Sequence, residues 1–403
     1  KRVAPSSIET GSSATYPARA ISPPLARTEQ GAKRARSARL TEPAIGGPMR
    51  AMSDATKRVL TGVKPTGIPH VGNYLGAIGP AVELARTRES FLFLADLHAL
   101  TIRPDPATLR EETYGVAAAW IALGMDPERT VFYRQSDIPE IPLLAWILSC
   151  SLPLGYLNRA HSFKDVQAKG TETQDILHGL YSYPVLMAAD ILLFEADEVP
   201  VGKDQKQHLE ICQEAARKIN HFYGGGQTLL KVPEALIDER VMTIPGLDGQ
   251  KMSKSYDNTL TPFMDAKALK KAMKKLVTDS TEYGQPLKVE DDVILTLIGL
   301  LAPERVPELE ARYRSGRKEP GRPDGDFADA TENYFGWGDA KKALVEVMIG
   351  RFAEARDTYA RLMDDKGELE RMLSRGAERA RAVARPVLSR LVEATGLTTR
   401  WPD

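Results

Sequence analysis

A chain of 403 residues is long enough for two domains, and its 54 basic residues balance 54 acidic ones, which excludes a protein that is basic over its whole surface. Two cysteines, Cys150 and Cys212, are too few and too far apart for a disulfide framework or a four-ligand zinc site, and they favour a reducing compartment, the cytoplasm. No apolar run approaches the roughly 18 residues of a membrane span, so we expect no membrane partner.

The first 55 residues are predicted to be a disordered leader. Up to about residue 52 they are rich in Ala, Arg, Ser and Pro and show no period that would support a packed helix or strand. The chain does not begin with Met, whereas Met49 and Met52 stand just before the first strand pattern. The leader is therefore a tag, an upstream extension or a transit peptide, and a mispredicted start is favoured over the transit peptide.

The first regular stretch is predicted to be strand, turn and helix. Residues 59–61 have a strand pattern, a Gly/Pro-rich turn follows, and residues 74–84 continue as a helix. Residues 90–95 are then apolar without alternation, as expected for a parallel strand covered on both faces. Asp96 and His98 follow at its carboxyl end, where ligands bind in open α/β sheets. His98 is thus either a pocket residue or a structural histidine.

Strand and helix patterns continue to alternate along the chain. Helical patterns cover residues 106–123 and 140–150, with a strand pattern at 130–133 between them. A further strand at 199–201 runs through a turn into a helix over 206–219, whose amide-rich start suits a phosphate or ribose. This alternation predicts an α/β fold with a doubly wound parallel sheet.

Residues 183–194 are predicted to form a buried helix, with Pro184 in its first turn. Asp190 is the only charged residue of this helix, and a buried carboxylate costs several kcal/mol, on the order of the penalties known for such groups, unless it is hydrogen-bonded or paired. Tyr183, Met187 and Asp190 are spaced to lie along one helical face. That face is a candidate pocket wall.

Beyond residue 260 we expect helices only, interrupted by a basic Gly/Pro-containing linker at 312–325. The first of these helices is amphipathic, with a lysine face opposite an apolar face. The lysine face is either solvated or a nucleic-acid contact. Its members are Lys267, Lys270, Lys271, Lys274 and Lys275.

Two motifs carry the chemistry. Residues 249–255, Gly-Gln-Lys-Met-Ser-Lys-Ser, form a loop with two lysines and two hydroxyls, which suits a polyphosphate. Residues 60–74 supply a strand end, a glycine turn and a helix start. Residues 251–255 match the KMSKS loop of class I aminoacyl-tRNA synthetases letter for letter, and residues 70–73, His-Val-Gly-Asn, resemble their HIGH element in the form typical of the tryptophanyl and tyrosyl branch.

Three further segments resemble the tryptophanyl-tRNA synthetase branch, at residues 183–194, 199–208 and 278–280. The resemblance covers almost everything from residue 57 onward. It implies a Rossmann-like catalytic domain at 56–259, with the insertion and dimer region at about 106–195, and a helical anticodon-binding domain at 260–403. It also implies a homodimer that activates L-tryptophan with ATP and transfers it to tRNA(Trp), with Mg²⁺ bound through the ATP phosphates.

The resemblance also implies roles for single residues. His70, Asn73, Lys251 and Lys254 would be catalytic, since attack of a carboxylate on the α-phosphorus needs alignment and charge stabilisation. Asp190 would accept a hydrogen bond from the indole N–H. The other tryptophan-pocket residues would be Tyr183, Met187, His98 and Gln205. The ATP residues would be Lys64, Pro65, Thr66, Gly72, Asn73, Gly202, Lys203, Asp204, Val241, Lys251, Met252, Ser253, Lys254 and Ser255.

Two alternatives stay open at this point. One is a tyrosyl-tRNA synthetase. Asp190, in the segment Met-Ala-Ala-Asp-Ile-Leu-Leu, is evidence against it. The other is a non-catalytic, synthetase-like regulator that binds tryptophan or RNA. The intact lysine loop and His70 are evidence against this alternative. The chain also departs from the family pattern at two positions, with Lys64 where many members carry Gln and Val166 where a second lysine often stands.

Overall fold

The computed structural model describes residues 57–160, 176–202, 205–236 and 243–398, and all structural statements below concern these residues. The predicted leader at 1–55 and the predicted ATP residues Lys203, Asp204 and Val241 lie outside them. Among the described helices, none combines the length and the apolar character needed to cross a membrane.

The fold is organised around a parallel sheet of five strands in the order β3-β2-β1-β4-β5. The strands are β1 (Arg58–Val63), β2 (Glu89–Leu94), β3 (Val131–Arg134), β4 (Glu198–Pro200) and β5 (Glu234–Leu236). The chain leaves β1 towards β2 on one side and later returns to pair β4 on the other side. This reversal next to β1 is the topological switch point of a doubly wound sheet, as the sequence predicted.

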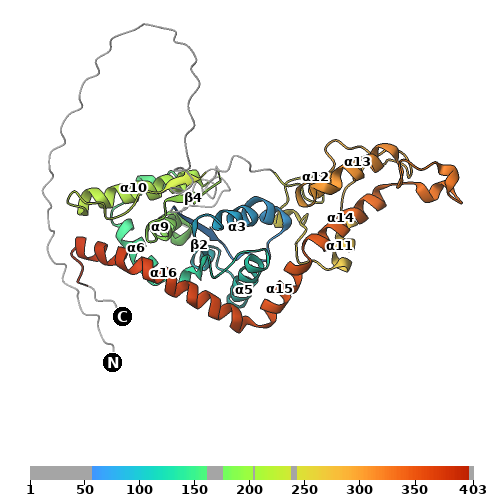
Figure 1. The fold of residues 1–403 in the computed structure, drawn as a ribbon. Helices are drawn as coiled ribbons and strands as arrows, with labels where there is room; N and C mark the ends of the chain where they lie inside the picture. The colour runs from blue at the N-terminus through green and yellow to red at the C-terminus, as the bar shows by residue number, and fades with distance from the viewer. Residues whose placement is uncertain (1–56, 161–175, 203–204, 237–242, 399–403) are drawn as a thin grey trace, which may run out of the picture. The chain divides into compact units, whose positions relative to one another are not determined.

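Helices surround the sheet and extend beyond it (Figure 1). In chain order they are α2 (Val71–Asn73), the π-helical turn η1 (Tyr74–Ile78), α3 (Gly79–Ala85), α4 (Asp96–Ala99), η2 (Leu100–Ile102), α5 (Pro106–Ala122), η3 (Gln135–Asp137), α6 (Glu140–Ser149), α7 (Leu154–Leu157), α9 (His178–Leu192), α10 (Lys206–Tyr223), η5 (Lys254–Tyr256), α11 (Ala266–Met273), α12 (Val293–Leu301), η6 (Pro303–Arg305), α13 (Val306–Ser315), η7 (Asp324–Asp326), η8 (Ala330–Asn333), α14 (Trp337–Arg351), α15 (Ala353–Asp364) and α16 (Lys366–Ala394).

Side chains of the central strands divide between two cores because successive residues of a strand point to opposite faces. Phe91 and Phe93 join the core formed with α6, α9 and α10, whereas Leu92 and Leu94 join the core formed with α5. All four are buried. The uninterrupted apolar run at 90–95 therefore covers a strand packed on both faces, as predicted.

The long helix α16 covers the edge strand β3 and contributes to both of these cores. Gly376 permits the approach, because a Cβ atom at this position would lie 1.6 Å from the carbonyl oxygen of Phe132. A helix this close leaves no room for another strand to pair with β3, so the edge is protected.

A third core is built by α11, α12, α13 and α14 together with residues of both sequence motifs. Val71 and Met252 are buried in it. The division into a catalytic domain at 56–259 and a helical domain at 260–403 stays a prediction. The packing refines it, because α16 shares its cores with the sheet, whereas α15 contributes Leu362 to a core of the sheet and Ala355 to the core of α11–α14.

Two details differ from the sequence expectations. Helix α9 begins at His178, so Pro184 lies inside it rather than in its first turn. Pro184 lacks the N–H that would bond to the carbonyl of residue 180, and burial of the following residues 184–192 holds the helix through this gap. The edge strand β5 was not predicted, because its three residues, Glu-Ala-Leu, carry no alternation.

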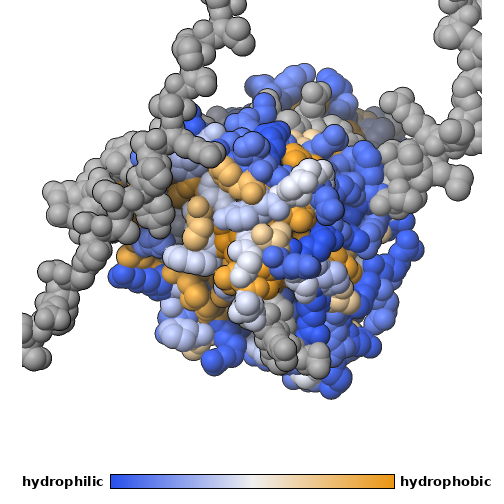
Figure 2. All heavy atoms as spheres, turned by 90° about the vertical axis from the view of Figure 1, so that its left-hand side faces the viewer, coloured by the Kyte–Doolittle hydropathy of each residue, from blue (hydrophilic) through white to orange (hydrophobic). Residues whose placement is uncertain are grey.

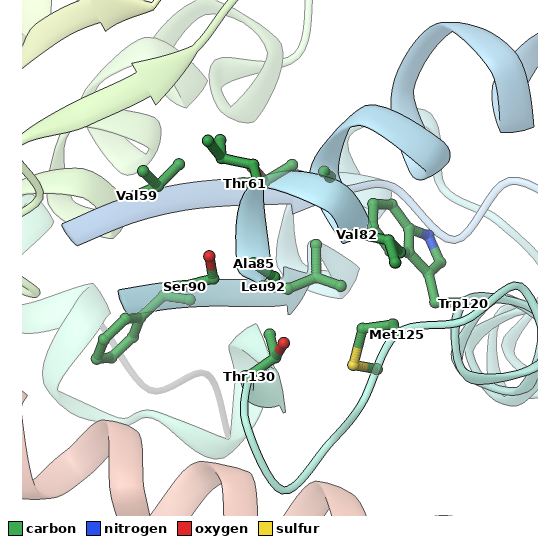
Figure 3. Close-up of a pocket in the computed structure, with 12 residues that line it drawn as sticks. Val59, Thr61, Val82, Ala85, Ser90, Leu92, Trp120, Met125 and Thr130 are labelled. Carbon is green, nitrogen blue, oxygen red and sulfur yellow. The ribbon is translucent and has the colours of Figure 1, made fainter. Parts of the chain in front are cut away.

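A small cavity of about 20 Å³ lies between the sheet and helices α3 and α5 (Figure 3). Ser90 lines it near the start of β2, and Thr130 lines it just before β3, so the cavity is near the amino ends of the strands. Trp120 also lines it, and its indole Nε1 is buried without a hydrogen-bond partner among the described residues. A space of this size holds about one water molecule, so it is not a substrate site.

Candidate active site

His70 is the N-cap residue of α2, directly after the Gly/Pro-rich turn that follows β1. Its Nδ1 accepts a hydrogen bond from Asn73 N (3.1 Å), and the Asn73 side chain accepts one from His70 N (3.1 Å). This reciprocal capping box fixes the orientation of the ring. Because Nδ1 accepts, the proton of the neutral imidazole is on Nε2, where it is available to a ligand.

The two sequence motifs meet although 180 residues separate them. Gly72 N donates to the sulfur of Met252 (3.3 Å), and Val71 N donates to Leu260 O (2.7 Å). Met252 is held in turn by a hydrogen bond from its N to Ile244 O (2.8 Å). The lysine loop and the histidine motif are therefore in contact through the backbone N–H of Gly72 and the side chain of Met252.

Lys254 lies over the turn that follows β1. Its Nζ donates to Thr66 O (2.5 Å), and Gly67 beside it has a φ of +80°, which only glycine adopts at little cost. A Cβ atom at Gly67 would approach Lys254 Nζ to 3.2 Å. Pro65 is buried beneath this turn, whereas Lys251 and Ser255 are exposed at the surface of the lysine loop.

Asn258 holds the lysine loop in shape, and sequence reasoning missed it. It is 2 % exposed, and its Oδ1 accepts from Ser253 N (2.8 Å) while its Nδ2 donates to Asp248 Oδ1 (2.7 Å) and Lys251 O (3.1 Å). One amide thus fixes the backbone on both sides of Met252. The hydroxyls of Ser253 and Ser255 lie 2.8 Å apart on the open side of the loop.

The motif residues combine cationic and neutral groups in a way that suits a polyphosphate. Burial and the nearby charge of Lys254 lower the pKa of His70 to about 4, so the imidazole is neutral at pH 7. Burial also lowers the pKa values of Lys254 and Lys64. Both lysines are nevertheless exposed, so an anionic ligand can reach them.

Asp190 of α9 is fully buried and uses both carboxylate oxygens. Its Oδ2 lies 2.8 Å from His98 Nε2, and its Oδ1 accepts from Gln135 Nε2 (2.7 Å). Burial raises the pKa of Asp190, while the hydrogen bonds from His98 and Gln135 lower it. His98 thus proves to be a partner of Asp190 at the carboxyl end of β2.

A second chain of polar side chains connects Tyr183 of α9 to the start of α10. The Tyr183 hydroxyl lies 3.0 Å from His208 Nε2, and His208 Nδ1 lies 2.9 Å from Gln205 Oε1. The ring of His98 meets that of Tyr183 edge to face, with centroids 6.0 Å apart. Lys64 Nζ lies 5.6 Å from the centroid of the same Tyr183 ring. Tyr183 is therefore the link between the motif turn after β1 and the buried polar cluster around Asp190.

A family model described as tRNA synthetases class I (W and Y) matches residues 52–352. The chain belongs to this family. The parallel sheet, the helical region after it and the contact between the two motifs are therefore those of a class I synthetase.

Known class I synthetases resemble the chain over most of its length. It is 45 % identical over 349 residues to the tryptophan–tRNA ligase of Pseudomonas syringae pv. tomato, covering 85 % of this chain and 74 % of the relative. The tryptophan–tRNA ligase of Neisseria meningitidis is 42 % identical, covering 85 % and 98 %. The tryptophanyl-tRNA synthetase of Campylobacter jejuni complexed with ADP and tryptophan shares 41 % identity, covers 84 % and 100 %, and superposes with a TM-score of 0.76.

Of the remaining predicted residues, the structure describes Gly202 and Met187. Gly202 follows β4, the strand beside β1, and its carbonyl accepts from Gln205 N (3.0 Å). Met187 is half-buried against the first core. Gln135 and His208 were missed, because neutral or lone polar side chains carry no periodic signal. Gln135 directly follows β3, so the rule that ligands gather at strand carboxyl ends would have pointed to it.

Proposed function

We propose that the chain activates L-tryptophan with ATP and transfers the tryptophanyl group to the 3′ end of tRNA(Trp), as a tryptophan–tRNA ligase. The observation that carries this proposal is the pairing of two sites. The contact between Gly72 and Met252 brings the lysine loop to the turn after β1, which suits a polyphosphate, and Tyr183 links that turn to a polar cluster with one buried carboxylate. The Asp190 carboxylate can accept a hydrogen bond from an indole N–H. The chain's similarity to curated tryptophan–tRNA ligases supports tryptophan as the substrate.

The first step forms one bond and breaks one. The tryptophan carboxylate oxygen attacks the α-phosphorus of ATP, the bond from that phosphorus to the bridging oxygen breaks, and pyrophosphate leaves with its electrons. His70 Nε2–H donates to a phosphate oxygen, and Lys251 and Lys254 meet the charge that grows on pyrophosphate. In the second step a ribose hydroxyl of the tRNA displaces AMP from the mixed anhydride.

ATP binding extends over the turn and the lysine loop in this proposal. The Gly72 backbone and Asn73 would approach the phosphates, and the residues of the turn at 64–66 and of the loop at 251–255 would surround them. Gly202, at the end of β4, would lie near the ribose. Mg²⁺ would enter on the phosphates, since this ion keeps oxygen ligands and retains its waters.

Asp190 has lone pairs left for the indole N–H in addition to its two present donors. An ionised carboxylate offers about four lone-pair positions, and His98 and Gln135 occupy one on each oxygen. Replacing Asp190 by Asn removes the charge of the acceptor. A charge-assisted hydrogen bond contributes roughly 1.5–3 kcal/mol, so tryptophan activation should fall about ten- to a hundredfold while the KM for ATP is spared.

The helical part offers a surface for tRNA between α11 and α14. A groove of about 340 Å³ has Met273 and Val345 on its apolar lining. Four lysines surround it, namely Lys270, Lys274, Lys341 and Lys342. An apolar floor with a basic rim fits an unstacked base whose phosphates contact the lysines. This supports the proposal that the helical domain reads the anticodon region.

A homodimer is the proposed assembly. Large apolar side chains are exposed on the sheet-bearing part, with Trp146 of α6 at 69 %, Leu154 of α7 at 64 % and Phe222 of α10 at 60 %. Figure 2 shows hydrophobic side chains gathered on one face of the molecule. A second copy would cover these residues, since exposed apolar clusters of this kind mark interfaces.

The test is amino-acid-dependent exchange of pyrophosphate into ATP, run with each of the standard amino acids. We expect exchange with tryptophan alone, followed by charging of tRNA(Trp) in a second assay. Exchange with tyrosine would make the chain a tyrosyl enzyme. Binding of tryptophan without any exchange would make it a non-catalytic regulator, and either result would end the proposal.

A further inference from the structure

Three buried groups form a closed ring of hydrogen bonds at the carboxyl ends of β2 and β3. Gln135 Nε2 donates to Asp190 Oδ1 (2.7 Å), His98 Nε2 contacts Asp190 Oδ2 (2.8 Å), and His98 N donates to Gln135 Oε1 (3.3 Å). Gln135 and Asp190 are fully buried, and His98 is 6 % exposed. Only His98 keeps a slight exposure, so the bond between Gln135 and Asp190 is shielded from bulk water.

The ring determines which way each group points. The backbone N–H of His98 needs an acceptor, so the Gln135 oxygen faces it and the Gln135 NH₂ group must face Asp190. An ionised Asp190 can only accept, so His98 carries its proton on Nε2. Donors on both oxygens fix the plane of the Asp190 carboxylate, and its remaining lone pairs then have fixed directions.

Gln135 is itself held from both neighbours in the chain. Arg134 forms two hydrogen bonds to Glu370 of α16 (2.6 and 2.8 Å). On the other side, Ser136 N donates to Asp96 Oδ1 (3.0 Å). The short turn that carries Gln135 is thus anchored to α16 and to the end of β2, so its amide cannot follow Asp190 if that side chain turns.

We propose that Gln135 is a positioning residue for amino-acid recognition: its amide holds the Asp190 carboxylate in the plane that presents a lone pair to the indole N–H. This rests on the proposed function, in which Asp190 accepts that N–H. Gln135 need not touch the substrate itself. It acts through Asp190, and it makes the pocket selective for a ligand with an N–H donor at this place.

The surroundings of Asp190 make the amide donor important. Burial raises the pKa of Asp190, and the Gln135 amide is one of the groups that oppose this rise. The other titratable groups that face it are His98, Tyr133, Cys212 and, further off, Asp96. Tyr133 is fully buried, and its hydroxyl has no hydrogen-bond partner in the described part of the chain. Without the amide, the carboxylate could turn towards that hydroxyl.

The test compares tryptophan with its benzothiophene analogue, in which sulfur replaces the indole N–H. The variant Gln135→Met keeps the size of the side chain and removes both the donor to Asp190 and the acceptor of His98 N. We expect its KM for tryptophan in pyrophosphate exchange to rise about tenfold, the size of effect typical of a charge-assisted hydrogen bond. The KM for the analogue should change less than about twofold, and the KM for ATP should not change, because neither depends on the indole N–H.

Equal losses for tryptophan and the analogue would show that Gln135 is merely structural and would overturn the proposal, as would an unchanged KM for tryptophan. Gln135→Asn, which withdraws the amide by one methylene, should give the same selective loss and serves if the Met variant does not fold. Asp190→Asn, measured with the same two ligands, distinguishes a failure of the role of Gln135 from a failure of the role of Asp190. If it is selective and both Gln135 variants are not, the pocket stands and the role of Gln135 falls; if it is not selective, both fall.

Discussion

Replacing His70 by asparagine separates the two roles of this side chain. In the structure His70 caps α2 through its Nδ1 and keeps Nε2–H for a ligand. Asparagine is a good N-cap residue and can accept the same backbone N–H, but it is too short to reach a phosphate with a second donor. We expect His70→Asn to keep the folding stability within about 0.5 kcal/mol, whereas His70→Ala loses the cap and about 1 kcal/mol.

The catalytic loss should be much larger than the loss of stability. A hydrogen bond from Nε2–H to a phosphate oxygen is charge-assisted and contributes roughly 1.5–3 kcal/mol, which corresponds to about a ten- to 150-fold fall in kcat. Both variants should show it in pyrophosphate exchange. If His70→Asn exchanges pyrophosphate at the wild-type rate, His70 serves only as a cap, and the role assigned to its Nε2 is wrong.

The pH dependence of stability gives a second readout on His70. Its pKa of about 4 in the folded chain lies below the ordinary value of 6.5, so the unfolded chain binds the proton more readily. Stability is therefore complete above about pH 6.5 and falls as the pH drops towards 4. His70→Asn removes this term. Urea unfolding at pH 7 and pH 4.5 should show a smaller loss in the variant than in the wild type, and equal losses would contradict the neutral, buried imidazole.

Three further changes test other parts of the molecule. Lys254→Ala should lower kcat of tryptophan activation more than tenfold with a smaller change in the KM for ATP, because it meets charge that grows only in the transition state; an effect on KM alone would contradict this. Gly376→Ala should lower the urea midpoint strongly, since the new methyl group meets the Phe132 carbonyl, whereas Gly350→Ala in the open part of α14 should raise it slightly; similar shifts would contradict the close packing of α16. The double change of Lys270 and Lys274 to Gln should raise the KM for tRNA and make its salt dependence shallower, with pyrophosphate exchange intact; an unchanged salt slope would exclude the groove from tRNA contact.

Much of the fold was predictable because its signals are local. The unbroken apolar run at 90–95 is typical of a strand covered on both faces. The turn after residue 61 has the glycines and proline that a strand-to-helix connection needs. The three-residue strand β5 and the helical turn before Pro184 gave no such signal. A pattern of two or three residues cannot separate strand from loop, and proline argues against a helix that burial nevertheless maintains.

A site residue was predictable where a charged side chain stands in an otherwise apolar segment. Asp190 is the only charge in an apolar helix, so a role was evident from the sequence alone. Its partner Gln135 was not, because a neutral amide is common and its meaning depends on β3 lying beside β2. Asn258 shows the same limit. Its function is to fix the backbone around Met252, and no spacing in the chain expresses which backbone groups will lack partners.

The two halves of the reaction are anchored in different cores. Val71 and Met252, which belong to the two sequence motifs, are buried with α11–α14, whereas the residues around Asp190 are buried with α6, α9 and α10. The attacking carboxylate and the α-phosphorus must meet within about 3–3.5 Å, and small misplacements are costly in rate. The alignment therefore depends on the relative position of two cores rather than on any single loop. Lys64 follows β1 beside the histidine motif, and Tyr183 lies beside Asp190. Their contact therefore joins the two groups of residues whose relative position aligns the carboxylate with the α-phosphorus.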